Sequence, residues 1–374
     1  MSATANLPTI IINDESMREG LQIESADIPT PDKIELLDAL SETGLQNIVV
    51  GSFVSPKWVP QMADVDSIIR GFKPREGVSY TALAMNARGV ERYLSFVPPL
   101  SVSPSRFRTM VHLCDVFVRR NNNRSQQSEI DGWPSVAERA RDEGVTEAAV
   151  GINAAWGSNW LGPFTQQLRE DMIQRQIDLW TEAGLPVTDI WIGDPMGWNV
   201  PSHVEAQVLS IRERWPSITK FHLHLHNTRG MAVTSAYLAM RALDASCRLT
   251  IDTSLGGMAG CPYCGNGRAA TLPPTEDFVQ LLEAEGVDTG IDLDKVVAAV
   301  ALAERVLGHP LYGHVSKAGP LPGRDALYAM DMPLVETLEQ AQHFQRGPEV
   351  YEGAQRPWRA PIESPARTAL GVDR

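Results

Sequence analysis

Three histidines alternate along one short segment of the chain. His222, His224 and His226 occupy every second position of FHLHLHNTRG, in a chain with only 8 histidines. Because side chains alternate between the two faces of a β-strand, a strand here would place the three imidazoles on one face. His224 and His226, nearest the end of the segment, form a candidate metal-binding pair. The alternative is half-buried histidines satisfied by the backbone or by a carboxylate, which is what we expect of the deeper His222.

Carboxylates that would complete such a site follow an earlier apolar run. The segment IINDESMREGLQ carries Asp14, Arg18 and Glu19 just past a strand candidate. A carboxylate and two imidazoles with open positions suit Mg²⁺, Mn²⁺ or Zn²⁺, a divalent ion that must also hold substrate oxygens. Arg18 beside them would stabilise a developing enolate or carboxylate charge. Taken in isolation, the same run is typical of a solvated loop.

A further acid and a glycine-rich loop follow two later strand candidates. Asp194, in WIGDPMGWN, would reach the same end of a sheet, or would serve only as a turn residue before Pro195. The segment SLGGMAGCPYCGNGR is predicted to be a mobile loop that closes over a substrate. We interpret its C-x-x-C pattern, Cys261 and Cys264, as carrying one thiol that acts as acid or base, ahead of a redox pair or a zinc knuckle. A structural loop is the alternative.

These residues meet only if the strands before them lie side by side. Short β-branched apolar runs alternate with longer segments of helical period, which predicts a (β/α)₈ TIM barrel. In such a barrel the carboxyl ends of all strands converge on one mouth. The eight strand candidates are Thr9–Asn13, Asn47–Phe53, Ser79–Ala84, Thr109–Leu113, Ala148–Asn153, Asp189–Ile192, Lys220–His226 and Arg248–Thr253.

Helix punctuation supports this count of elements. Thr30 and Pro31 predict a helix start, and Gly44 predicts its end. Ser202 and Glu205 predict a capping box for a later helix. Beyond about residue 305 the chain becomes rich in Gly-Pro clusters and poor in apolar periodicity. We therefore predict a barrel domain over residues 1–304 and, over 305–374, a C-terminal extension that packs on the barrel or on a neighbouring subunit and has a loosely ordered tail.

Composition narrows the class of protein. The 374 residues are 43% hydrophobic and 21% charged, which is typical of a globular protein with a sizeable core. A formal net charge of −13 argues against nucleic acid or an anionic membrane as the main partner. No apolar run of about 18 residues is present, and the 4 cysteines are too few and too unevenly spaced for a disulfide framework. We expect a cytoplasmic protein with reduced thiols.

Six segments together resemble one known group, the DRE-TIM metallolyases, and within it the 3-hydroxy-3-methylglutaryl-CoA (HMG-CoA) lyase branch. They fall in one order over roughly residues 9 to 286, and SFVSPKWVPQM is highly specific. The segments are REGLQ (18–22), SFVSPKWVPQM (52–62), FVRRNNNRS (117–125), GDPMGWNVP (193–201), HLHNTRG (224–230) and GGMAGCPY…TED (256–277).

The resemblance implies a barrel that binds a divalent ion and cleaves a hydroxyacyl-CoA bearing a second carboxylate by retro-Claisen or retro-aldol chemistry. It implies a small-molecule acyl-CoA or hydroxy-acid partner and assembly as a homodimer or higher homo-oligomer. Carried over residue by residue, Arg18 matches the catalytic arginine, Asp194 the acid near the substrate hydroxyl and Cys261 the loop thiol. Asp14 matches the leading acid of the D-x-x-x-R-E pattern. The metal ligands matched are Glu19, His224, His226 and, as a candidate for the metal asparagine, Asn266.

Departures from the lyase pattern keep other functions open. Glu19 stands where the lyases usually carry aspartate and is the choice of the carboligases, such as homocitrate synthases. Val49 stands where they place a glutamate, and the loop between Cys261 and Thr275 differs in length. The segment GHVSKAGP, with His314 and Lys317, also resembles the carboligase extension. The alternatives are a carboligase that joins an acyl-CoA to a 2-oxo acid, and a catalytically inactive barrel that binds a ligand.

Overall fold

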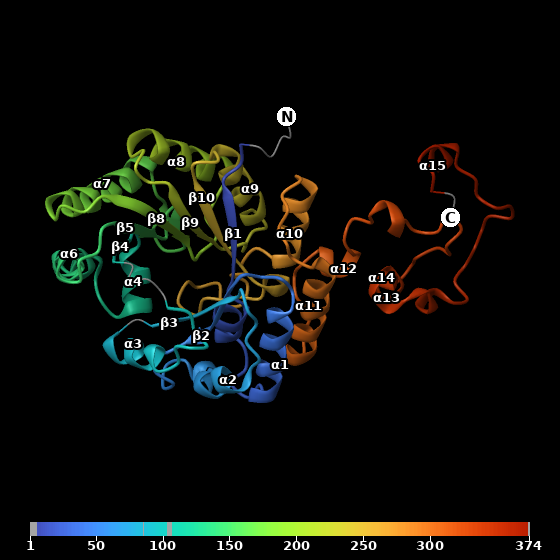
Figure 1. Ribbon diagram of the computed structural model, residues 1–374, viewed down its shortest axis with the longest axis horizontal. Helices are drawn as coiled ribbons and strands as arrows, with labels where there is room; N and C mark the ends of the chain where they lie inside the picture. The colour runs from blue at the N-terminus through green and yellow to red at the C-terminus, as the bar shows by residue number, and fades with distance from the viewer. Residues whose placement is uncertain (1–5, 85, 103–106, 373–374) are drawn as a thin grey trace.

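The fold is a curved sheet of eight parallel strands, seen in a computed structural model that describes residues 6–84, 86–102 and 107–372 (Figure 1). The order in the sheet is β3-β2-β1-β10-β9-β8-β5-β4, which is the cyclic order of a TIM barrel with β3 and β4 as its two ends. This confirms the predicted fold class, and every strand lies within two residues of its prediction. The strands are β1 (Thr9–Asp14), β2 (Asn47–Ser52), β3 (Ser79–Leu83), β4 (Arg108–His112), β5 (Ala148–Asn153), β8 (Val187–Asp194), β9 (Lys220–Leu225) and β10 (Arg248–Thr253).

Helices lie around the outside of these strands (Figure 1). The sheet helices are α1 (Thr30–Ser41), α2 (Val65–Gly71), α3 (Ala87–Leu94), α4 (Asp115–Asn122), α5 (Gln126–Asp131), α6 (Trp133–Asp142), α7 (Gln166–Glu182), α8 (Pro201–Arg214), α9 (Ala232–Ala242), α10 (Thr275–Ala284) and α11 (Leu293–Leu307). Shorter elements are the π-helix η1 (Ser16–Gly20), the 3-10 turns η2 (Pro60–Met62) and η3 (Leu255–Gly257), and the hairpin of β6 (Gly157–Ser158) and β7 (Gly162–Pro163). In the described residues, no helix is long and apolar enough to cross a membrane.

The structure tests the boundaries that the sequence predicts for α1 and α8. α1 begins at Thr30 with Pro31 in its first turn, but its N-cap is Pro29 and not Thr30, the N-cap that the sequence predicts. Gly44 after it has a φ of +91° and no room for a side chain, because a Cβ would lie 2.5 Å from the Gly290 carbonyl oxygen. The capping box at Ser202 and Glu205 is wrong. α8 begins two residues earlier than such a box requires, with Val200 as its N-cap and no side-chain cap. Proline at the first helical position has no N–H to satisfy and has its φ preset, so Pro201 fixes this start.

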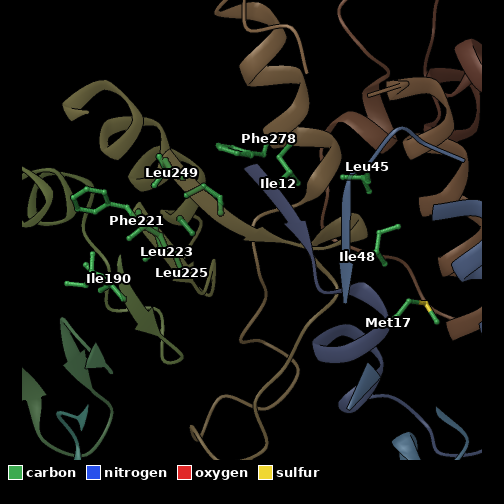
Figure 2. Packing of buried hydrophobic residues seen from close by; sticks show 14 of the residues in the cluster. Ile12, Met17, Leu45, Ile48, Ile190, Phe221, Leu223, Leu225, Leu249 and Phe278 are labelled. Atoms are coloured by element: carbon green, nitrogen blue, oxygen red, sulfur yellow. The ribbon is translucent and has the colours of Figure 1, made fainter. Parts of the chain in front are cut away.

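The alternation of side chains along β9 separates the core from the mouth. Phe221, Leu223 and Leu225 are at most 1% exposed and belong to the main hydrophobic core (Figure 2). Burial of three such side chains contributes about 1.5–3 kcal/mol each, so the strand's orientation is strongly fixed. The intervening histidines are thereby held on the opposite face.

The C-terminal extension consists of short elements beyond α11. In Figure 1, α13 (Leu338–Ala341), α14 (His343–Arg346) and α15 (Pro365–Ala369) lie past α12 (Val315–Ala318), on the side away from the sheet. The 3-10 turns η4 (Arg324–Ala326) and η5 (Pro348–Tyr351) complete it. The division predicted at residue 305 falls within α11, which continues to Leu307. A boundary near this helix end remains our proposal for the two domains.

A buried carboxyl group joins the extension to the barrel. Glu276, in the first turn of α10, is fully buried, and its Oε2 accepts a hydrogen bond of 3.0 Å from the Gly256 N–H. A Cβ at Gly313 would lie 1.7 Å from Glu276 Oε1, so a larger residue in the extension would displace this carboxyl group. Burial raises the pKa of Glu276 to about 8. The folded protein therefore favours the protonated carboxyl group.

We expect Glu276→Gln to flatten the pH dependence of stability. A group whose pKa rises on folding stabilises the folded state fully at a pH below its unfolded pKa, which is near 4.5 here. This stabilisation is lost as the pH rises through the folded pKa of about 8. The wild-type free energy of unfolding should fall between pH 5 and 8 by on the order of 2 kcal/mol more than that of the variant. Urea unfolding at several pH values measures this. Glu283→Gln, at an exposed position of the same helix, is the control, and equal slopes in all three proteins would contradict the assignment.

Candidate metal centre and active site

The end of β1 turns sharply and aims Glu19 across the sheet. Glu15 follows the strand, and its carbonyl oxygen accepts the Glu19 N–H at 2.8 Å, at the start of η1. Asp14 stabilises this turn, because one oxygen accepts the Ser16 N–H at 2.9 Å and the other the Thr275 hydroxyl at 2.8 Å. Asp14 thus faces away from the mouth. Its role in the pattern is to shape the turn that carries Arg18 and Glu19.

Three atoms that could bind a metal ion converge at the mouth, two from the end of β9 and one from η1. His226 Nε2 lies 3.2 Å from Glu19 Oε1, His224 Nε2 lies 3.6 Å from Glu19 Oε2, and the two Nε2 atoms lie 3.1 Å apart. All three side chains are buried, and their ligand atoms lie within 4.8 Å of one another. The three residues predicted as ligands from two distant segments are therefore in one cluster, which is a geometry that can hold a metal ion.

The hydrogen bonds of the two imidazoles leave lone pairs facing each other. His226 Nδ1 lies 2.8 Å from the Ala270 carbonyl oxygen, which can only accept, so Nδ1 carries the proton. His224 Nδ1 lies 2.7 Å from Asp252 Oδ2 and donates in the same way. In the neutral rings both Nε2 atoms then hold lone pairs, directed at one another and at Glu19. A cation between them resolves this repulsion, so the donor set fits a divalent ion.

The charges around the cluster favour positive charge within it. Burial raises the pKa of Glu19, but Arg18 and His224 outweigh it and hold this pKa well below its usual range. Burial likewise lowers the pKa of His224, yet Glu19 and Asp252 raise it to about 10. The negative field that draws a proton to this ring equally draws a metal ion.

Asp252 is a functional residue that sequence reasoning missed. It lies in β10, is 2% exposed, and accepts from His222 Nε2, His224 Nδ1 and Asn13 Nδ2, each at 2.7 Å. Burial alone would raise its pKa, but the two histidines keep this pKa far below the usual range. His222 is thus bound to Asp252 outside the cluster, as expected of a structural histidine. An acid one residue before the end of the last strand was the available signal.

Arg18 and Asp194 lie beside the cluster and differ in how many of their polar atoms are hydrogen-bonded. Arg18 Nη1 pairs with Glu19 and lies 3.6 Å from Glu15 Oε2, while its buried Nε has no hydrogen-bond partner among the described residues. Asp194 ends β8, and burial raises its pKa. Its carboxylate accepts three hydrogen bonds from its own loop: from Trp198 N at 3.0 Å, and from Asn199 N and Nδ2 at 2.7 Å each. Most of its capacity to accept is therefore used.

The glycine-rich loop brings Cys261 close to the mouth. Cys261 is 7% exposed and forms a β-bridge with Gly267, and the Cys264 thiol lies 3.2 Å from the Cys261 carbonyl oxygen. The nearby Cys264 thiol and burial raise the pKa of Cys261, so its thiol stays neutral. Asn266 is half-buried, and its Oδ1 accepts from the Asn159 amide. The structure thus pairs Asn266 with the hairpin of β6 and β7, and its role as a ligand stays a prediction.

The chain belongs to the HMGL-like family, whose match spans residues 9–302. A (R)-citramalyl-CoA lyase of Chloroflexus aurantiacus is 32% identical over 325 residues, covering 84% of this chain and 96% of that protein. A hydroxymethylglutaryl-CoA lyase of Bacillus subtilis is 30% identical over 305 residues, covering 81% and 94%. An HMG-CoA lyase from Acinetobacter baumannii, solved with coenzyme A and 3-methylmalate, superposes with a TM-score of 0.67 at 25% identity, covering 85% and 97%. The predicted superfamily and lyase class are confirmed.

We expect His226→Ala to abolish tight metal binding, because it removes one of the converging Nε2 lone pairs. Affinity for Mn²⁺ should fall at least about 100-fold. Calorimetric titration of the metal-free protein and metal analysis after dialysis measure this. His222→Ala is the matched control, since this histidine lies on the same strand face but bonds Asp252 outside the cluster. Equal losses of metal in both variants would contradict the ligand assignment.

Proposed function

We propose that this protein is a divalent-metal-dependent carbon-carbon lyase that cleaves a hydroxyacyl-CoA bearing a second carboxylate, similar to HMG-CoA. The observation that carries the proposal is the convergence of the His224 and His226 lone pairs with the Glu19 carboxylate. Support comes from the two relatives, which are named as lyases of HMG-CoA and of (R)-citramalyl-CoA. The solved complex with coenzyme A and 3-methylmalate favours an acyl-CoA as partner.

The metal would be held by Glu19, His224 and His226, with Asn266 as a further candidate, and its chemistry there is Lewis-acid polarisation of substrate oxygens. Arg18 donates hydrogen bonds to the thioester oxygen and stabilises the enolate that develops on it. As the hydroxyl loses its proton, its electron pair forms a carbonyl, and the adjacent C–C bond breaks toward the enolate. Cys261 then gives its thiol proton to the enolate carbon.

Asp194 and the loop support this reaction. Asp194 lies near the substrate hydroxyl and keeps the β8 loop in place through the hydrogen bonds to Trp198 and Asn199. The glycine-rich loop must exclude water, because water would protonate the enolate without control and weaken the charge interactions around it. We also propose Mg²⁺, Mn²⁺ or Zn²⁺ as the native ion, a cytoplasmic location and a homo-oligomeric assembly.

A carboligase is the second candidate, because Glu19 rather than aspartate follows Arg18. In that direction an acyl-CoA would condense with a 2-oxo acid. Two assays separate the candidates. The first follows acetyl-CoA formation from HMG-CoA and from (R)-citramalyl-CoA with Mg²⁺ or Mn²⁺. The second follows free thiol released from acetyl-CoA with a panel of 2-oxo acids. Turnover in the first assay alone supports the lyase, and turnover in the second alone supports the carboligase.

We expect Cys261→Ala to reduce turnover about 100- to 10,000-fold, because the enolate loses its proton donor. Bound metal should be unchanged, since the thiol is not one of the converging ligands. Steady-state rates on the better thioester and metal analysis of the same samples measure both quantities. Cys264→Ala, in the same loop, is the control and should stay within a few-fold of wild type. Wild-type rates in the Cys261→Ala protein would remove this thiol from the mechanism.

A further inference from the structure

Glu15 is a buried acid at the mouth that the sequence analysis did not single out. It follows β1 directly and is only 8% exposed. Its Oε1 accepts from the Asn13 amide at 3.4 Å. Its Oε2 is buried without a hydrogen-bond partner among the described residues, and the nearest cationic atom is Arg18 Nη1 at 3.6 Å. One oxygen of this carboxyl group therefore accepts no hydrogen bond and has only the ion pair with Arg18.

The alternation along β1 turns Glu15 into the barrel. Asn13 faces the interior, where its amide bonds Asp252, and Asp14 faces outward, where it bonds Thr275 of α10. Glu15, one step further, lies on the Asn13 side again. The charged and titratable groups that surround it are Arg18, Glu19, Asp252 and His224. Glu15 thus lies beside the cluster of converging ligands without belonging to it.

Glu15 differs from four other described carboxylates, three at this mouth and Asp14 on the outer side of β1. Asp14 and Asp252 have both oxygens hydrogen-bonded, and Asp194 accepts three hydrogen bonds from its own loop. Glu19 is engaged by Arg18 and by the two histidines. A group that accepts a proton from substrate needs an accessible lone pair, and an oxygen that accepts no other hydrogen bond offers the most. Of these five side chains, Glu15 has such an oxygen.

The strand register sets Glu15 beside an apolar residue of the neighbouring strand. β1 pairs with β2 through Asn13↔Asn47 and Asp14↔Ile48. Continued by one residue, this register sets Glu15 alongside Val49. Ile48 and Val50 belong to the main hydrophobic core, whereas Val49 between them does not, so Val49 faces the interior. The neighbouring strand therefore offers the mouth a valine, and the carboxyl group at this level comes from Glu15.

We propose that Glu15 is a catalytic residue that accepts the proton of the substrate hydroxyl through Oε2. This inference rests on the proposed lyase function and names its base. The proton passes from the hydroxyl oxygen to Glu15, and the oxygen's electron pair forms the new carbonyl. The C–C electron pair passes to the thioester enolate, which takes its proton from the Cys261 thiol. The proton held by Glu15 later returns to the Cys261 thiolate through solvent, so the cycle is balanced.

The test moves the carboxyl group from one strand to the next. Glu15→Gln and Glu15→Val should each lower kcat on HMG-CoA or (R)-citramalyl-CoA at least about 100-fold, with KM and bound Mn²⁺ within a few-fold of wild type. In Glu15→Val/Val49→Glu, the acid returns at the same level on β2, and kcat should recover at least tenfold over Glu15→Val. Recovery by relocation is an effect that a merely structural residue would not produce.

The possible results separate a failure of the role proposed for Glu15 from a failure of the proposed lyase function. If wild type turns over a thioester and Glu15→Gln stays within threefold of its kcat, the inference is wrong and the lyase function stands. If wild type cleaves neither thioester, the proposed function is wrong and this role for Glu15 is wrong with it. If thermal melting shows that Glu15→Gln does not fold, the double variant decides, since recovery supports the role and its absence contradicts it.

Discussion

The site depends on two hydrogen bonds that lie behind the imidazoles. The Asp252 carboxylate and the Ala270 carbonyl each accept an Nδ1 proton, which fixes both ring orientations and both tautomers. Nε2 of His224 and of His226 are thereby turned toward Glu19. Neither acceptor belongs to the cluster itself. A change in β10 or in the loop end would therefore alter the orientation of the two imidazoles without touching Glu19, His224 or His226.

The same arrangement compensates buried charge. Glu19 and Asp252 are buried charged groups, and an isolated buried charge would cost several kcal/mol. Each is paired with a group from another segment of the chain: Glu19 with the histidines of β9, and Asp252 with β9 and β1. The polar mouth is thus stable only in the assembled barrel, because its partners come from strands that are adjacent only after folding.

Local patterns predicted most of what the structure shows. Period-two alternation placed His224 and His226 on one face, and β-branched runs located all eight strands. Asp252 and Glu15 were missed because their roles depend on the register of β1 with β10 and β2, which no single segment encodes. The capping box at Ser202 failed because the adjacent Pro201 determined the helix start. Asn266 could not be placed because its loop follows no period.

The loop that carries Cys261 leaves and re-enters the barrel at one point. Ser254 and Pro274 form a bridge, Ser254 N bonds the Pro273 carbonyl at 3.1 Å, and Thr275 N bonds the Ser254 carbonyl at 2.9 Å. Residues added or removed at the tip then change only the entropy of closing the loop, by fractions of a kcal/mol. The tip can vary in length while the strands keep their positions. The surface around Cys261 can therefore change in evolution while Ser254 and Thr275 hold the two ends of the loop together.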